Sequence, residues 1–341
     1  MRASPAQASS ASAGATSSRT PTSPRRFREF HRRSPPVLGF LYNTCPGDDN
    51  DGHVAARFVP TSASRVPHWA QDSRHGRVLL FNGFNFVVCV PIADERYLSG
   101  RTAAVLCASA VCDHLDCHRG PFIVVLVGTM PGTGTTCSFV YSSAADAWGE
   151  PIYGPHSDYT MGGWPRSALV GNALYFVFEG NKTILEYDLG TGAMSVIELP
   201  REQTQPFINL FGPIELTSTV DGRLGFARVE MSRLCVWSME EAGGAMWVLR
   251  QAIELEKMLP LPAKWASKLF LVGSAEGGGV IFVAMEDQLF TVDLRCGQAT
   301  KIYEHPRLSN AVVVPYMSFL FLELRTTPST DDGPRASTSR A

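Results

Sequence analysis

Short apolar runs separated by gaps that contain Gly, Asn and Asp dominate the chain, most clearly in Gly171–Pro200. This stretch contains three such runs, Ala173–Phe178, Thr183–Tyr187 and Ala193–Leu199. β-Branched and aromatic residues favour strands, whereas Gly, Asn and Asp favour tight turns. The pattern therefore predicts consecutive antiparallel strands. Because Ala173–Phe178 is apolar throughout and does not alternate, we expect a strand that is buried on both faces.

The same arrangement recurs along the chain with a period of about 50 residues. The segments Leu174–Phe176, Leu224–Phe226 and Val280–Phe282 occupy equivalent places in three successive repeats. Four-stranded units with this period are typical of β-propeller blades, which stack around an axis and cover both faces of each other's inner strands. We predict an all-β fold, a β-propeller of four-stranded antiparallel blades. Six blades fit the length, five to seven remain open, and helix content should be low.

Closure of such a ring requires one blade to be shared between the two ends of the chain. We expect an N-terminal strand, Val37–Tyr42 (VLGFLY), to pair with a C-terminal one, Ser318–Leu324. A closed ring leaves only short, protected sheet edges.

Composition divides the chain into four segments. Residues 1–24 are rich in Ala, Ser, Thr and Pro and contain no acidic residue, which predicts a disordered leader. Residues 25–36 form a basic segment that ends at a Pro-Pro pair, and residues 325–341 read as a disordered tail. We assign residues 37–324 to the propeller domain.

Charge and cysteine content narrow the classes of partner. The chain has 341 residues, 45% of them hydrophobic, and a net charge of −2. We therefore expect neither a nucleic-acid partner nor a membrane partner. No hydrophobic signal core follows the N-terminus, so we expect cytoplasmic or nuclear localisation and free thiols for the eight cysteines. The Ser- and Arg-rich leader leaves organelle import as an alternative.

The most suggestive cluster of reactive side chains is CASAVCDHLDCH. Its five possible zinc ligands are Cys107, Cys112, His114, Cys117 and His118. Their spacings match no common zinc module, in which C-x2–4-C pairs flank a long loop. We interpret the segment as a structural loop between two strands, with zinc binding as the less favoured alternative.

No other pattern indicates catalysis. Asp188 and Asp293 each end a strand before a Gly-containing turn, where a carboxylate accepts hydrogen bonds from backbone N–H groups. The glycine-rich segments 128–134 and 277–279 lack the Lys-Ser/Thr of a phosphate loop. Neither a nucleophile elbow nor a Ser-His-Asp order is present. We predict no catalytic residue, no cofactor site, no metal site and no enzymatic activity.

Aromatic residues fall into two groups. Trp148 and Trp247 follow turns at blade positions, which predicts a packing role. Trp69, Tyr159 and Trp164 lie between the predicted strands. Exposed aromatic residues on loops are common anchors in protein interfaces, so we name these three as candidate partner contacts.

Several segments together resemble plant, especially grass-type, F-box proteins. Phe27–Phe40 is similar to the junction that follows the F-box. His114–Phe122, Val140–Trp148, Val170–Phe176 and Ile184–Leu189 resemble recurring segments of the F-box-associated β-propeller domain. The resemblance implies that residues 25–36 are a basic remnant of the C-terminal end of an F-box.

The resemblance also implies a function. In this family the propeller recruits a protein target, and the F-box docks on a Skp-type adaptor of a cullin–RING ubiquitin ligase. Met1–Pro24 matches neither the LPxxLLxEIL-like start nor the Cys-Lys-x-Trp-like centre of an F-box. We expect a non-enzymatic protein-interaction module with an unknown protein target, and adaptor and cullin as partners only if an F-box exists. The alternative is a propeller enzyme or small-ligand binder with its site at the central channel.

Overall fold

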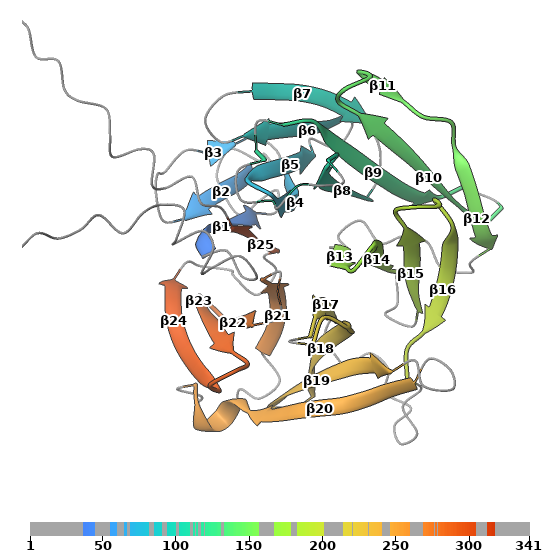
Figure 1. Ribbon diagram of the computed structural model, residues 1–341. Coiled ribbons are helices and arrows are strands. Elements are labelled where there is room, and N and C mark those ends of the chain that lie inside the picture. Colours follow the sequence, from blue (N-terminus) through green and yellow to red (C-terminus); the bar gives the residue numbers. More distant parts are fainter. Residues whose placement is uncertain are drawn as a thin grey trace, which may run out of the picture.

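Six antiparallel sheets are arranged as a ring in the computed structural model (Figure 1). The structure describes residues 37–44, 55–59, 65–66, 69–81, 85–90, 94–99, 102–109, 112, 114, 117–118, 120–130, 133–156, 167–178, 183–200, 214–219, 221–230, 232–240, 246–259, 269–275, 277, 279–304 and 312–317. The helical content of these residues is one 3-10 turn, η2 (Leu255–Lys257). Among them no helix has the length and apolar character needed to cross a membrane.

Each sheet is one blade, and in four of the six the strands follow chain order from the axis outward (Figure 1). Blade 1 has the order β25-β1-β2-β3, and in blade 3 both β11 and β12 pair with β10. The strands are, in blade 1, β1 (Val37–Thr44), β2 (Ala55–Val59), β3 (Arg65–Val66) and β25 (Val313–Met317); in blade 2, β4 (Trp69–Arg74), β5 (Arg77–Phe81), β6 (Asn85–Val90) and β7 (Asp94–Ser99); in blade 3, β8 (Thr102–Cys107), β9 (Phe122–Thr129), β10 (Thr135–Ser142), β11 (Ala147–Trp148) and β12 (Ile152–His156); in blade 4, β13 (Ser167–Val170), β14 (Ala173–Val177), β15 (Thr183–Asp188) and β16 (Met194–Glu198); in blade 5, β17 (Glu215–Ser218), β18 (Leu224–Glu230), β19 (Arg233–Glu240) and β20 (Met246–Glu254); and in blade 6, β21 (Leu269–Ser274), β22 (Val280–Met285), β23 (Gln288–Asp293) and β24 (Gln298–Glu304).

Strand β14 shows why the apolar run Ala173–Phe178 does not alternate. Every residue of β14 is buried. Leu174 and Phe176 pack in a cluster with blade 3, whereas Tyr175 and Val177 pack in a cluster with blade 5. Successive side chains of a strand point to opposite faces, so both faces are covered by neighbouring blades. This confirms the sequence prediction and the propeller architecture.

The sequence repeat also maps onto equivalent strands. Phe176, Phe226 and Phe282 lie on β14, β18 and β22, the second strand of blades 4, 5 and 6, and all are fully buried. Burying a phenylalanine stabilises the fold by about 1.5–3 kcal/mol relative to leaving it exposed. The repeat therefore reflects one packing requirement that recurs in each blade.

The ring closes through blade 1, in which β1 pairs antiparallel with β25 from the other end of the chain. Tyr42 lies opposite Val313, and Phe40 lies opposite Pro315. Closure by terminal strands is as expected, but the C-terminal partner is Val313–Met317, whereas Ser318–Leu324 lies outside the described residues. Pro315 cannot donate a ladder hydrogen bond, and β25 is the edge strand of its sheet, where a proline is tolerated.

A buried side-chain amide joins blade 1 to blade 2. The Asn43 Nδ2 group donates to the carbonyl of Ala70 at 2.8 Å, and its Oδ1 accepts from the N–H of Ala70 at 2.8 Å. The backbone N–H of Asn43 donates to Val312 beside β25 at 3.0 Å. The Asn43 side chain thus joins blade 1 to blade 2 through two hydrogen bonds, one that it donates and one that it accepts.

We predict that Asn43→Asp destabilises the ring, because a carboxylate cannot donate to Ala70. The free energy of unfolding should fall by at least about 2 kcal/mol at neutral pH. Burial raises the pKa of an aspartate, so acidification should protonate it, restore a donor and narrow the gap to wild type. Urea denaturation across pH would measure this, and a gap that stays constant down to about pH 4 would contradict it.

Candidate functional site

The channel at the centre of the ring is the first candidate. Its cavity is small, about 50 Å³. That volume admits a few water molecules, whereas pockets for small-molecule ligands occupy roughly 300–1,000 Å³. The lining comes from the innermost strands of the blades and the segments beside them: Asp72, Ser73, Arg74, Ser167, Ala168, Leu169, Leu216, Thr217, Ser218, Ser274, Ala275, Val314 and Pro315.

A buried ion pair on β4 supplies the charged groups of this lining. Arg74 Nη1 lies 2.5 Å from Asp72 Oδ2. Asp72 also accepts from the N–H of Val105 in blade 3 at 2.8 Å, and Arg74 donates to the carbonyl of Ser167 in blade 4 at 2.6 Å. Buried charges persist when they are paired and hydrogen-bonded. These two side chains therefore link three blades.

The structure corrects the sequence prediction that Trp69 lies between strands. Instead Trp69 is the first residue of β4 and is half-buried. The sequence of β4, WAQDSR, is polar and therefore does not look like a buried strand. Its charged residues are nevertheless buried, because they form hydrogen bonds with other blades and not with solvent. Whether Trp69 contacts a partner stays a prediction, and Tyr159 and Trp164 lie outside the described residues.

The turn aspartates have the structural role expected of them. Asp188 Oδ1 accepts from the N–H of Thr191 at 2.7 Å and from its hydroxyl at 2.8 Å, and from the N–H of Gly190 at 3.0 Å. Asp293 Oδ1 accepts from the N–H of Arg295 at 2.8 Å. The Thr191 hydroxyl, followed by the Thr191 amide, holds the pKa of Asp188 below its ordinary value.

The tryptophans expected to pack do so, each against aromatic neighbours. Trp148 meets Tyr141 edge-on, with ring centroids 5.6 Å apart. Trp247 meets Phe226 edge-on at 4.9 Å, and its Nε1 donates to the carbonyl of Glu198 in blade 4 at 2.9 Å.

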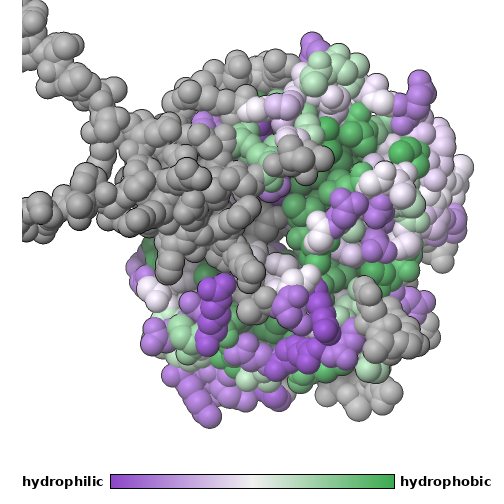
Figure 2. Space-filling model, in the orientation of Figure 1, coloured by the Kyte–Doolittle hydropathy of each residue, from purple (hydrophilic) through white to green (hydrophobic). Residues whose placement is uncertain are grey.

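Four exposed apolar side chains lie on the outer strands of blades 3 and 4, and we call this group the rim patch. Its members are Trp148, Ile152, Tyr153 and Val196. Gly192 has a φ of +72°, which favours glycine, and Ile152 Cδ1 lies 2.6 Å from the place that a Cβ of Gly192 would occupy. This contact brings β12 against the turn that precedes β16. In Figure 2, hydrophobic residues gather over blades 3 and 4 toward the centre of the ring, whereas pale and hydrophilic residues lie along the outer edge of these blades.

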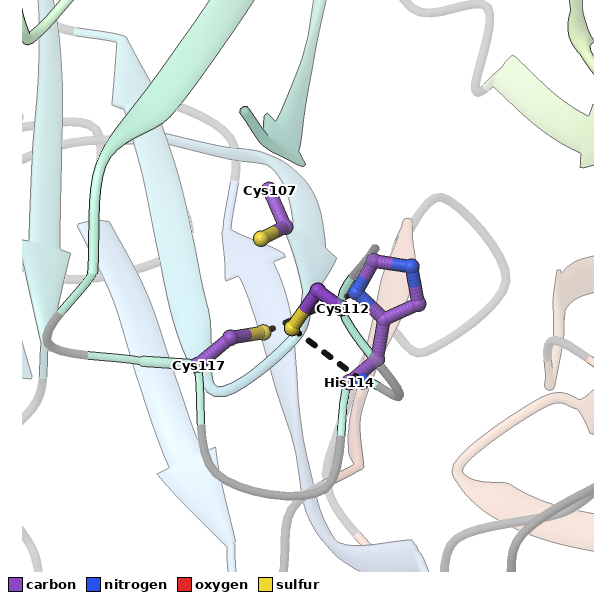
Figure 3. A group of neighbouring side chains, drawn as sticks. All are labelled: Cys107, Cys112, His114 and Cys117. Atoms are coloured by element: carbon purple, nitrogen blue, oxygen red, sulfur yellow. Dashed lines mark hydrogen bonds between the residues drawn. The ribbon is translucent and has the colours of Figure 1, made fainter. Parts of the chain in front are cut away.

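The loop between β8 and β9 holds a third candidate, which we call the cysteine cluster. Its members are Cys107 at the end of β8 and Cys112, His114 and Cys117 in the loop. One ligand atom from each, three sulfurs and an imidazole nitrogen, lies within 4.8 Å of all the others. Figure 3 shows the three sulfur atoms and the imidazole Nδ1 turned toward one another.

Neighbouring groups fix the shape of this loop. Arg77 is fully buried and donates to the carbonyls of Cys117 and, at 2.7 Å, Gly120. The His114 ring stacks on His75, with centroids 4.1 Å apart and planes at 11°. Burial and then the charge of His114 lower the pKa of His75 to about 3, so this ring is neutral at physiological pH.

Cys117 is unsuited to act as a catalytic nucleophile. Burial and then the neighbouring thiols of Cys107 and Cys112 raise the pKa of Cys117 to about 12. A cysteine nucleophile needs the thiolate, which requires a lowered pKa. The sequence spacing C-x4-C-x-H-x2-C suggested a plain loop, and no local signal showed that the end of β8 would bring Cys107 to the other three.

Comparisons with known proteins place the chain in a family. The architecture defines a β-propeller, and a family model described as F-box protein AT5G49610-like, beta-propeller, matches residues 70–320. The chain therefore belongs to this family, as the sequence resemblance implied. A comparison with curated proteins gave no match.

Solved structures with a similar arrangement are remote in sequence. A putative 6-phosphogluconolactonase from Bacteroides uniformis is 12% identical, with 81% of this chain and 85% of that chain covered at a TM-score of 0.41. The Cps50 (Swd1) β-propeller domain of Myceliophteria thermophila is 8% identical, with 80% and 88% covered at 0.41. A catalytically inactive virginiamycin B lyase from Staphylococcus aureus is 11% identical, with 80% and 87% covered at 0.39.

We predict that the Asp72–Arg74 pair is strongly coupled. Arg74→Met should lower the free energy of unfolding by about 3–5 kcal/mol, because it leaves a buried carboxylate without its cation. In Asp72→Asn/Arg74→Met the loss should be smaller than the sum of the two single losses. A urea double-mutant cycle measures the coupling, and strictly additive losses would disprove it.

Asp188 gives a pH-dependent prediction. Its pKa is lowered in the folded state, so its stabilisation is complete above the ordinary value of 3.8 and is lost as the pH falls through the folded value. Asp188→Ala should lower Tm at neutral pH, and the difference from wild type should shrink below about pH 4. Asp188→Asn, whose amide oxygen still accepts, is the control and should lose less. Thermal melts with an equal difference at all pH values would refute this.

Proposed function

We propose that this protein is a non-enzymatic, target-binding propeller of the F-box-associated class. The observation that carries the proposal is the family match across residues 70–320, on a ring whose described blades are closed and densely packed. A rigid ring presents its loops and outer edges in fixed positions, which reduces the entropy lost on binding a protein. The target is a protein, and its identity is open to experiment.

The channel favours this proposal over an enzyme or a small-ligand binder. A catalytic site would need ionisable groups from several blades to converge around a substrate-sized space. In the described part of the lining, the charged groups are Asp72 and Arg74, both from β4 and bonded to each other. Both also hold neighbouring blades, so they serve the scaffold.

The rim patch is the surface that best suits a protein contact. Aromatic and aliphatic side chains that remain exposed in a group are typical of binding surfaces. Tyr153 is the most exposed of them, and tyrosine combines a large apolar area with a polar tip at low entropic cost. Within the patch, Ile152 of blade 3 contacts Gly192 of blade 4, so the two blades meet there.

Ubiquitin-ligase function is the further step of this proposal. In a chain that carries an F-box, the propeller would present its target to a cullin–RING ligase through a Skp-type adaptor. Without one, the same propeller would hold the target alone or compete with full-length relatives for it. Both roles fit a cytoplasmic or nuclear protein.

Affinity purification with matched surface variants tests the contact surface. In Tyr153→Ser/Val196→Ser, side chains that are 60% and 37% exposed lose their apolar area. The control, Met246→Ser/Leu249→Ser on β20, changes side chains that are 55% and 43% exposed in blade 5. We expect the rim variant to lose co-purifying proteins by about tenfold or more, and the control to retain them. Equal recovery from both variants would place the binding surface elsewhere.

The same purification tests ligase assembly. Recovery of an adaptor and a cullin with the wild-type chain would show that docking occurs. Recovery of target proteins without either subunit would show that the propeller binds its target without ligase assembly. Turnover of a small molecule that depends on Asp72 and Arg74 would instead favour the enzyme alternative.

A further inference from the structure

We propose that Cys107, Cys112, His114 and Cys117 form a structural zinc site. Three sulfurs and one imidazole nitrogen match one of the common ligand sets of closed structural zinc sites. Soft thiolate ligands select zinc over magnesium or calcium, which prefer oxygen. The inference is independent of which target the propeller binds.

The distances between the ligand atoms fit a tetrahedral ion after a small contraction. Ligand atoms around zinc lie roughly 3.5–3.8 Å apart, because a Zn–S bond is about 2.3 Å and a Zn–N bond about 2.0 Å. Here all four atoms lie within 4.8 Å of one another, and Cys117 Sγ and His114 Nδ1 are already 3.7 Å apart. The longest separation therefore needs to shorten by about 1 Å.

The backbone of the loop also favours metal binding by the cluster. The N–H of His114 points at Cys112 Sγ at 3.3 Å, and such bonds stabilise a sulfur that carries negative charge. His114 has a φ of +57°, a left-handed conformation that costs energy in a residue other than glycine. In this strained conformation the Nδ1 atom of His114 faces the three sulfur atoms.

Residues around the cluster supply a positive charge and contacts that orient the ligands. A zinc ion with three thiolates and a neutral imidazole carries a net charge of about −1. The buried Arg77 guanidinium bonds to the carbonyl of Cys117, so a positive charge lies at the back of the cluster. His75 stacks on the ligand ring, and its Nδ1 accepts from the N–H of Cys107 at 3.2 Å. Such outer contacts orient metal ligands.

The site also has an entry path and a structural task. His114 is exposed, so the ion can reach the cluster from solvent. The four residues span the last residue of β8 and the loop that leads to β9. A zinc ion would fix this long connection against blade 2, where regular strand pairing cannot.

Metal analysis of the full-length chain tests the proposal. The protein is expressed with Zn²⁺, purified under reducing conditions and passed over a desalting column. We expect about one zinc ion per wild-type chain, and near-complete loss in Cys112→Ser and Cys117→Ser. The controls Cys137→Ser and Cys296→Ser remove thiols outside the cluster and should retain the ion.

Spectroscopy on the wild-type chain tests the zinc site even if the cluster variants do not fold. Replacing zinc with Co²⁺ should give thiolate-to-cobalt charge-transfer bands and the intense visible bands of tetrahedral cobalt. X-ray absorption on the zinc protein should show three sulfur ligands and one nitrogen. A wild-type chain that binds neither metal would overturn the proposal, as would a Cys296→Ser chain that loses as much zinc as Cys112→Ser.

Discussion

The face-to-face packing of apolar blades is the interaction on which the rest of this structure depends. Each of the six hydrophobic clusters of the described residues lies between two adjacent blades, including one between blade 6 and the closing blade 1. A single four-stranded sheet cannot cover both of its faces, so no blade is stable alone. Closing the ring gives every inner strand two neighbours, and the terminal strands β1 and β25 complete the last pair of interfaces.

Apolar packing sets the ring but leaves the relative position of the blades loosely defined, and buried polar bonds specify it. Asn43 bonds to Ala70 between blades 1 and 2, and Arg74 bonds to Ser167 between blades 2 and 4. The Ser274 hydroxyl donates to Leu216 between blades 6 and 5 at 2.8 Å. Because a buried polar group without its partner is costly, a small slip of one blade would be penalised.

On this packed ring, the outer strands and the connections between strands are the parts that can carry function. The rim patch lies on the outer strands of blades 3 and 4, and the cysteine cluster lies at the end of β8 and in the connection from β8 to β9. Each is joined to a neighbouring blade by a specific contact, Ile152 with Gly192 and Arg77 with the carbonyl of Cys117. The scaffold thus gives fixed geometry to side chains that their own backbone could not hold.

The sequence by itself determined the strands, the repeat, the turn aspartates and closure of the ring by its ends, because these follow from local patterns. Apolar runs such as Ala173–Phe178 report burial directly, and Asp188 acts on residues two and three positions away. Only the tertiary structure decided that β4 is a strand with a satisfied ion pair, and that four separated ligands converge near the end of β8. Those features depend on atoms brought together from different blades and loops, and residue spacing along the chain carries no measure of that distance.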